Sequence, residues 1–223
     1  VPFQYNWDTG IGANDTDRSI TNIQPVVPFS LNDDLNIISR TILPVIDSPS
    51  PVSGGEDHSG VGDIVQSIFV GPKNPTSSGW LWGAGPVFLL PTASDNALGT
   101  EKWGAGPTAV ALKQENGWTY GGLFNHIWSF AGESDRANVN ATFLQPFWGY
   151  TFPTQTTLTL LSESTYDWTT DQWTVPINLV ASQVLKVANQ PFSLALGYRK
   201  YVETPEGGPD WGIRFVLTLI FPK

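Results

Sequence analysis

The chain has 223 residues, with 11 Lys and Arg against 20 Asp and Glu, so its formal net charge is -9. This acidic balance argues against a surface that binds nucleic acid phosphates. Cysteine is absent, which excludes a disulfide framework and a thiolate metal site.

Aromatic residues are abundant and charged residues are scarce. The chain contains 10 Trp, 12 Phe and 6 Tyr, whereas only 14% of its residues are charged. One ordinary core does not need so many rings, so part of them should lie at a surface that is not simply water. No apolar run reaches about 18 residues, which excludes an ordinary transmembrane helix but not a membrane barrel made of alternating strands.

Segments with a period of two follow one another along the whole chain, separated by clusters of Asn, Asp, Gly, Pro and Ser. The predicted strands are Phe3 to Gly12, Ser19 to Leu31, Leu35 to Ile46, Gly62 to Gly71, Trp80 to Ala93, Trp103 to Lys113, Trp118 to Phe130, Val139 to Phe152, Thr157 to Asp167, Trp173 to Val187, Phe192 to Val202, and Trp211 to Phe221. An even number of about twelve strands suits a closed outer-membrane barrel. The sequence therefore predicts an all-β fold, a closed antiparallel up-and-down transmembrane β-barrel, with residues 1–223 as a single domain.

Short and long connections alternate along the chain. Short turns such as "NDD", "QENG" and "ANQ" alternate with longer acidic loops such as "ANDTDR", "AGESDRAN" and "ETPEGGP". Up-and-down barrels with short periplasmic turns and long outer loops show this pattern. Two explanations remain open for the acidic outer rim: a set of solvated loops, or a surface that binds divalent cations next to lipopolysaccharide.

The two faces of each strand differ in polarity. In the last strand Ile213, Phe215 and Leu217 share one face, while Arg214 lies on the other. Extending this parity places polar side chains in the lumen and apolar ones against lipid, with Trp residues at the strand ends forming two interfacial girdles. The candidate constriction residues of the lumen are Arg40, Glu163, Asn178, Arg199 and Arg214.

Arg199 and Arg214 should face each other across neighbouring strands, which is unfavourable unless a carboxylate, water or anionic solute lies between them. Glu163 is the inward acid that could occupy this place. Such a group of charges could orient a small polar or anionic solute, or it could brace the barrel as a salt-bridge network.

The pentapeptide "WGAGP" occurs twice, at Trp82 to Pro86 and at Trp103 to Pro107. We expect the two copies not to be neighbours, with their tryptophans in opposite girdles and a local break of the sheet at each proline. If the tryptophans face lipid, the glycines point inward and form a lumen wall of small residues. These glycines are Gly83, Gly85, Gly104 and Gly106.

The sequence offers little sign of catalysis. His126 and Ser129 are three positions apart, so a strand sends them to opposite faces. Barrel phospholipases carry a His and a Ser two positions apart on one strand, an arrangement that this sequence lacks. We therefore expect no enzymatic activity, no catalytic residue, no cofactor and no metal site, and an interfacial or structural role for His126.

Several motifs together resemble one family. "NIQPVVPFSL", "WGAGPVFLLPTAS", "NVNATFLQPFWGYTF" and "PDWGIRFVLTLIFP" are similar to an uncharacterised family of bacterial outer-membrane transporters. That family is linked by name to the meta-pathway of phenol degradation, and its members are often mislabelled neuromedin U. The resemblance implies a Gram-negative outer-membrane location. The aromatic-rich last strand, which departs from the usual pattern only in Pro222 and Lys223 after Phe221, resembles the signal read by the barrel assembly machinery.

These observations leave two hypotheses for the function. The first is a monomeric channel in contact with outer-membrane lipid and lipopolysaccharide, through which a small aromatic or anionic solute diffuses passively. The second is an occluded barrel with a structural or surface-binding role and no transport activity. A barrel of about twelve strands is narrow enough that inward side chains decide between them.

Overall fold

The structure is a computed structural model that describes residues 1–52, 54–188 and 190–221. Within these ranges the chain is almost entirely β-strand, with one short 3₁₀ helix, η1 (Asn96–Leu98). No helix of the described chain is long and apolar enough to cross a membrane. The predicted all-β fold class is confirmed, while Pro222 and Lys223 lie outside the described residues.

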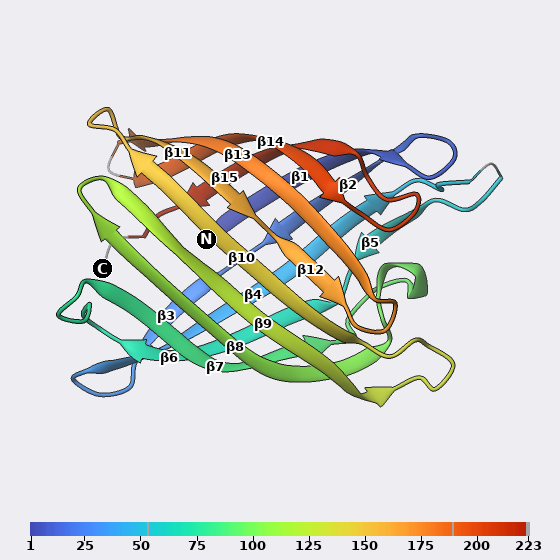
Figure 1. Ribbon diagram of the computed structural model, residues 1–223, viewed down its shortest axis with the longest axis horizontal. Helices are drawn as coiled ribbons and strands as arrows, with labels where there is room; N and C mark the ends of the chain where they lie inside the picture. Colours follow the sequence, from blue (N-terminus) through green and yellow to red (C-terminus); the bar gives the residue numbers. More distant parts are fainter. Residues whose placement is uncertain (53, 189, 222–223) are drawn as a thin grey trace.

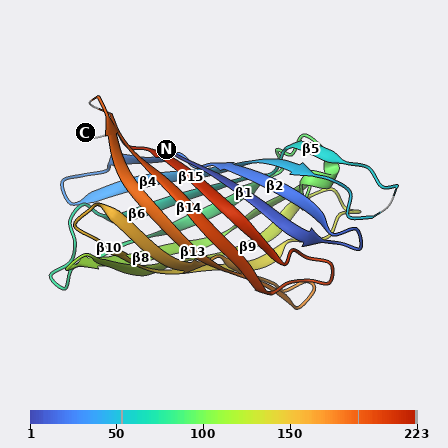
Figure 2. The same cartoon turned by 90° about the horizontal axis from the view of Figure 1, so that it is seen from above.

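Fifteen strand segments form one antiparallel sheet that closes on itself, because β9 pairs with β10 at the end of the strand order. The closed wall of tilted strands is visible from two directions (Figures 1 and 2). The segments are β1 (Pro2–Ile11), β2 (Thr16–Ile23), β3 (Val26–Ser30), β4 (Leu35–Ser48), β5 (His58–Val61), β6 (Ile64–Pro72), β7 (Trp80–Leu90), β8 (Lys102–Glu115), β9 (Trp118–Gly132), β10 (Asn140–Thr151), β11 (Thr156–Ser162), β12 (Ser164–Asp167), β13 (Gln172–Val187), β14 (Gln190–Glu203) and β15 (Trp211–Leu219).

Two of the predicted strands, Ser19 to Leu31 and Thr157 to Asp167, are each divided into two segments, and a third, predicted from Gly62, is preceded by an additional segment, β5. The pairs are β2 with β3, β5 with β6, and β11 with β12, and each pair lines up along the same neighbouring strand. Pro25 lies in the first break and cannot donate a ladder hydrogen bond, and Glu163 lies in the third. Counting each pair as one strand gives the predicted 12-strand barrel in the described part of the chain.

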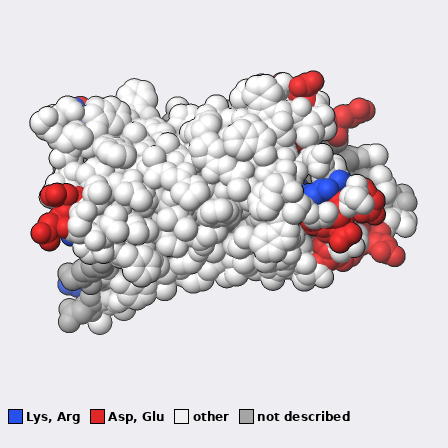
Figure 3. Space-filling view, turned by 90° about the horizontal axis from the view of Figure 1, so that it is seen from below, with Lys and Arg blue, Asp and Glu red and all other residues white. Residues whose placement is uncertain are grey.

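The turns at one end of the barrel are tight. Asn116 and Gly117 join β8 to β9 with φ values of 51° and 84°. Positive φ at both central residues is typical of the type I′ turn, which matches the twist of the flanking strands. The other end carries the longer, acidic connections, and Figure 3 shows Asp and Glu concentrated there, at the right of the view.

The outward face of the barrel is apolar and the inward face is largely polar. Phe215 and Leu217 are exposed, whereas Arg214, which directly precedes Phe215, is buried. The wall between the two ends lacks visible charge on the face drawn in Figure 3. Ring pairs mark both rims: Trp118 and Trp148 stack 5.2 Å apart at the short-turn end, and Trp7 meets Trp211 at 5.5 Å near the long loops.

The two "WGAGP" copies meet at their prolines, since the β7–β8 register pairs Pro86 with Pro107. The expectation that the copies are not neighbours is therefore wrong. Neither proline can donate a hydrogen bond to the strand on its other side, and the β6–β7 and β8–β9 pairings are interrupted at these positions. The expected break at each proline is thus present.

Candidate functional site

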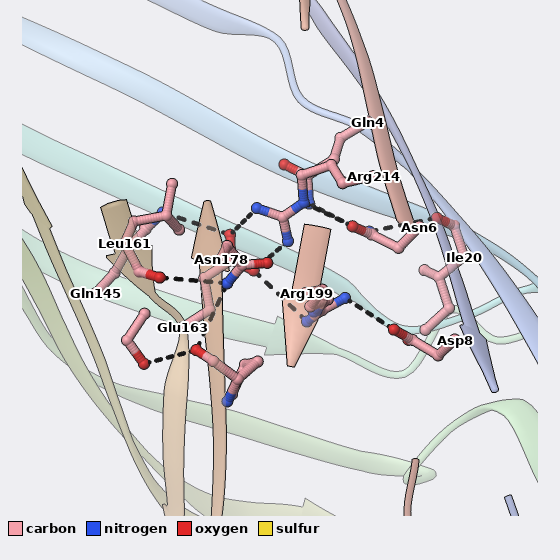
Figure 4. Close-up of polar contacts among 12 residues, drawn as sticks. Gln4, Asn6, Asp8, Ile20, Gln145, Leu161, Glu163, Asn178, Arg199 and Arg214 are labelled. Atoms are coloured by element: carbon pink, nitrogen blue, oxygen red, sulfur yellow. Dashed lines mark hydrogen bonds and ion pairs between the residues drawn. The ribbon is translucent and has the colours of Figure 1, made fainter. Parts of the chain in front are cut away.

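Charged side chains from four parts of the wall converge inside the barrel (Figure 4). Arg214 comes from β15, Arg199 from β14 and Asp8 from β1, and Glu163 lies in the break between β11 and β12. These strands follow one another around the wall as β12, β13, β14, β15 and β1, so the site covers a continuous sector of the lumen.

Glu163 holds Arg214 in a two-pronged ion pair. Arg214 Nη1 donates to Glu163 Oε1 at 3.1 Å, and Arg214 Nη2 donates to Glu163 Oε2. Arg214 Nε donates to Asn6 Oδ1 at 2.8 Å, and only 3% of the Arg214 residue is exposed. Paired bonds of this type fix both the position and the orientation of a guanidinium group.

Arg199 shares the same carboxylate. Its Nη2 lies 3.6 Å from Glu163 Oε2, and its Nη1 lies 3.4 Å from Asp8 Oδ1. The β14–β15 register places Gly197 opposite Arg214 and Gly212 opposite Arg199, so the two arginines are diagonal rather than directly opposite. Glu163 therefore occupies the place between two like charges where a carboxylate is needed.

A hollow of about 380 Å³ adjoins this group on the side of the "ETPEGGP" loop. Asp8, Arg18, Arg199 and Tyr201 contribute to its lining. Arg18 Nη2 lies 3.8 Å from Asp8 Oδ2. The buried Nε atoms of Arg18 and Arg199 have no hydrogen-bond partner among the described residues, so donors remain available to a solute or to water.

The other two constriction candidates lie beside this group. Asn178 is fully buried and donates weakly to the carbonyl oxygens of Leu161, at 3.4 Å, and Pro176, at 3.5 Å. Arg40 donates to Gln24 Oε1 at 3.1 Å and interacts with Glu163 through charge alone. We call Asp8, Arg18, Arg40, Glu163, Arg199 and Arg214 the lumen charge cluster; its two carboxylates and four guanidinium groups carry a formal charge of +2.

The wall of small residues also faces inward but is not bare. Gly83 and Gly104 are buried, and a Cβ on Gly104 would lie 2.7 Å from Ile127 Cγ2 and 3.2 Å from Leu89 Cβ. A Cβ on Gly83 would lie 3.2 Å from Phe69 Cβ. Large side chains from neighbouring strands therefore cover these glycines. We call the resulting surface the apolar wall; it consists of Val65, Phe69, Val87, Leu89, Ile127 and Val139.

Gly85 and Gly106 have a different role, since each precedes one of the paired prolines. A Cβ on Gly85 would collide with the carbonyl oxygen of Ile68, and a Cβ on Gly106 would collide with that of His126. The absence of a side chain lets the neighbouring backbone approach closely where the ladder is broken.

Two parts of the site are not among the residues nominated from the sequence. Arg18 lies across the β1–β2 register from Asp8, and strand parity along β2 could have found it. The apolar wall gave no usable signal, because β6 and β7 carry apolar residues on both faces and parity alone cannot say which face is inside.

The histidines lie outside the lumen charge cluster. His126 Nδ1 is 2.7 Å from Thr142 Oγ1, and His58 Nδ1 is 3.2 Å from Asp95 Oδ2 in the loops. Ser129 is on the opposite face from His126, as the spacing predicts, and its hydroxyl accepts from the backbone N–H of Val139.

Comparison with solved structures identifies the architecture. An outer membrane channel from Pseudomonas putida F1 superposes with a TM-score of 0.72 at 20% identity, covering 99% of this chain and 94% of that one. The chain has the fold of an outer-membrane β-barrel. No protein-family model and no curated protein matches the sequence. The predicted outer-membrane location is confirmed, and the barrel wall lies in lipid.

Two further outer-membrane barrels in this comparison are enzymes. Outer membrane phospholipase A from Escherichia coli and the calcium-bound phospholipase dimer from Salmonella typhi each have a TM-score of 0.56 at 11% identity. They cover 97% of this chain, and the chain covers 91% and 89% of them. These two neighbours contradict the expectation, drawn from the spacing of His126 and Ser129, that the chain is not an enzyme, because barrels of this fold include enzymes.

Proposed function

We propose that this protein is an outer-membrane channel for passive diffusion of small organic anions that carry an apolar body, such as aromatic carboxylates. The observation that carries the proposal is the lumen charge cluster, with a formal charge of +2 inside a chain whose net charge is -9. Residues 1–223 act in this proposal as one monomeric barrel, inserted by the assembly machinery.

The physical basis is a lumen with two unlike sides. Guanidinium groups donate paired hydrogen bonds that fit a carboxylate, and buried positive charge attracts anions. Five of the six residues of the apolar wall lie on β6, β7 and β9, across the lumen from β14 and β15 in the strand order, and the sixth, Val139, directly precedes β10. The guanidinium groups can attract the charged group of an aromatic carboxylate, and the enclosed apolar residues make the other side of the lumen a favourable environment for its ring.

The similarity to the Pseudomonas putida channel supports the barrel part of this proposal. The motif resemblance to transporters linked with phenol degradation supports the aromatic part. Pairing within the lumen charge cluster favours passage rather than tight binding, because Glu163 and Asp8 compete with a passing anion for the same arginines.

Planar-bilayer recording tests the proposal. Wild-type protein should give discrete channel events with a reversal potential that indicates anion preference. The double variant Arg199→Ser/Arg214→Ser lowers the formal charge of the cluster from +2 to zero, so the anion preference should disappear while channel events persist. Liposome swelling with benzoate should exceed swelling with an uncharged sugar of similar size. Absence of channel events from correctly folded protein would defeat the proposal in favour of the occluded barrel.

A further inference from the structure

A shallow apolar groove crosses the lipid-facing side of the barrel. It has a volume of about 680 Å³ and extends from β7 across β8, β9 and β10 to β12 and β13. Its floor consists of small residues that are partners in the register: Ala84 pairs with Ala109, Ala111 pairs with Gly122, and Gly122 pairs with Pro146. Trp82, Phe124, Leu144 and Trp173 contribute to its sides.

A polar group lies directly above this groove on the same two strands. His126 follows Phe124 by two positions on β9, and Thr142 precedes Leu144 by two on β10, so all four share the outward face. His126 Nδ1 lies 2.7 Å from Thr142 Oγ1, and Trp168 Nε1 donates to the same oxygen at 2.8 Å. The ring of Trp128 covers His126 at a centroid distance of 4.2 Å.

Thr142 Oγ1 accepts from Trp168 and still has its own hydrogen to donate, so we assign its contact with His126 Nδ1 as a hydrogen bond donated by Thr142. A neutral His126 then carries its ring hydrogen on Nε2, which is buried and has no partner in the described part of the protein. The buried Asn140 Oδ1, two residues before Thr142 on the same face and nearer the long loops, likewise has no partner within the described ranges. The group thus offers one unused donor and one unused acceptor.

The depth of this group in the membrane suits a lipid linkage. Trp118 and Trp128 mark the two girdles on β9. Their separation along the membrane normal is about 25 Å at a rise of roughly 3.3 Å per residue and a tilt of about 40°, which is the height of the apolar band. His126 and Thr142 therefore lie just inside the outer girdle, where acyl chains join their headgroups.

We propose that the groove and the polar group above it form a binding site for one acyl chain of lipid A, the membrane anchor of lipopolysaccharide. The chain lies over Ala111 and Gly122, and its amide linkage meets His126 and Asn140. An amide carries both an acceptor and a donor, which complements the unused donor and acceptor of the protein, whereas the ester groups of a glycerophospholipid only accept. In the orientation usual for outer-membrane barrels, with the longer loops outside, the site lies in the leaflet that contains lipopolysaccharide.

Native mass spectrometry of the detergent-solubilised barrel titrated with purified lipid A tests this site. Wild-type protein should retain one lipid A per barrel. Ala111→Phe fills the groove, and Thr142→Val removes the hydroxyl that orients His126 with little change in shape; each should weaken retention at least tenfold. Ala181→Phe, on the exposed face of β13 outside the groove, should bind as the wild type does.

Only variants that keep the heat-modifiable migration of a folded barrel are compared, and Thr142→Val provides the test if Ala111→Phe does not fold. Equal retention of lipid A by the wild type and by Thr142→Val would overturn the proposal. Equal competition by a phosphatidylethanolamine of the same chain length would also overturn it, because the site would then not select the amide linkage.

Discussion

Removing the charge of Glu163 is the most informative single perturbation of the lumen. Glu163→Gln keeps the shape of the side chain but leaves Arg214, 3% exposed, and Arg199, with a side chain 12% exposed, without their shared carboxylate. Removing one partner of a buried ion pair costs about 3–5 kcal/mol. At a urea m-value of about 2 kcal/mol per M, the unfolding midpoint should fall by about 2 M.

The assay is urea unfolding of the barrel in lipid vesicles, followed by tryptophan fluorescence. Glu203→Gln is the matched control, since Glu203 is an exposed carboxylate at the end of β14 that only approaches Gln172 at 3.4 Å. Its free energy of unfolding should change by less than about 0.5 kcal/mol. The double variant Glu163→Gln/Arg214→Gln should be less destabilised than the sum of the two single variants, because it removes the unpaired buried charge.

The single variant Glu163→Gln also raises the formal charge of the lumen charge cluster from +2 to +3. Anion selectivity in planar bilayers should therefore increase while stability falls. An unchanged unfolding midpoint, or an effect equal to that of Glu203→Gln, would refute the argument that Glu163 holds the two arginines in place.

Three further predictions concern the wall, the apolar side of the lumen and the loops. Gly106→Ala should destabilise the barrel by about 1–3 kcal/mol, since its Cβ would collide with the carbonyl oxygen of His126. Gly122→Ala is the control, because the nearest atom to its Cβ would be 3.6 Å away. Equal urea unfolding midpoints for the two variants would contradict the prediction. Ile127→Asn should reduce swelling with benzoate more than with acetate, because it makes the apolar wall polar; an equal reduction would remove that wall from the pathway. The N–H of Ala97 and the ring of His58 hold the pKa of the Asp95 carboxyl below its usual value. The stabilisation of the loop by the Asp95 carboxylate is thus present above the unfolded pKa of about 3.9 and is lost as the pH falls through the lower folded pKa. The NMR chemical shift of the Ala97 amide should titrate with a midpoint below that of a free aspartate. A midpoint at or above that of a free aspartate would show that the contact is absent in solution.

The sequence predicts the barrel because its signals are local. Two-residue alternation and the turn "ENG" depend on neighbours in the chain, and the inward placement of Arg199 and Arg214 follows from parity along β14 and β15. The partner of Arg214 is harder to derive, since Glu163 lies 51 positions away and reaches it across two intervening strands. Such a contact depends on the register of every strand between them.

Which residues of β6 to β9 face the inside of the barrel could not be predicted from the sequence, for another reason. Parity arguments assume a polar lumen, whereas Phe69, Leu89 and Ile127 are buried inside the barrel. With apolar residues on both faces, only the closed structure shows which set is enclosed. The pairing of Pro86 with Pro107 is likewise set by the register of the β7–β8 hairpin, which the sequence of the connecting loop, residues 91–101, does not reveal.

The paired prolines also divide the wall mechanically. β7 and β8 share an unbroken ladder from Trp80 and Lys113 to Leu89 and Gly104, whereas the ladders on both outer sides of this hairpin are interrupted. A pulling force applied along the strands meets fewer hydrogen bonds at these two borders than within the hairpin. In single-molecule extraction from a membrane, β7 and β8 should therefore leave together in one step.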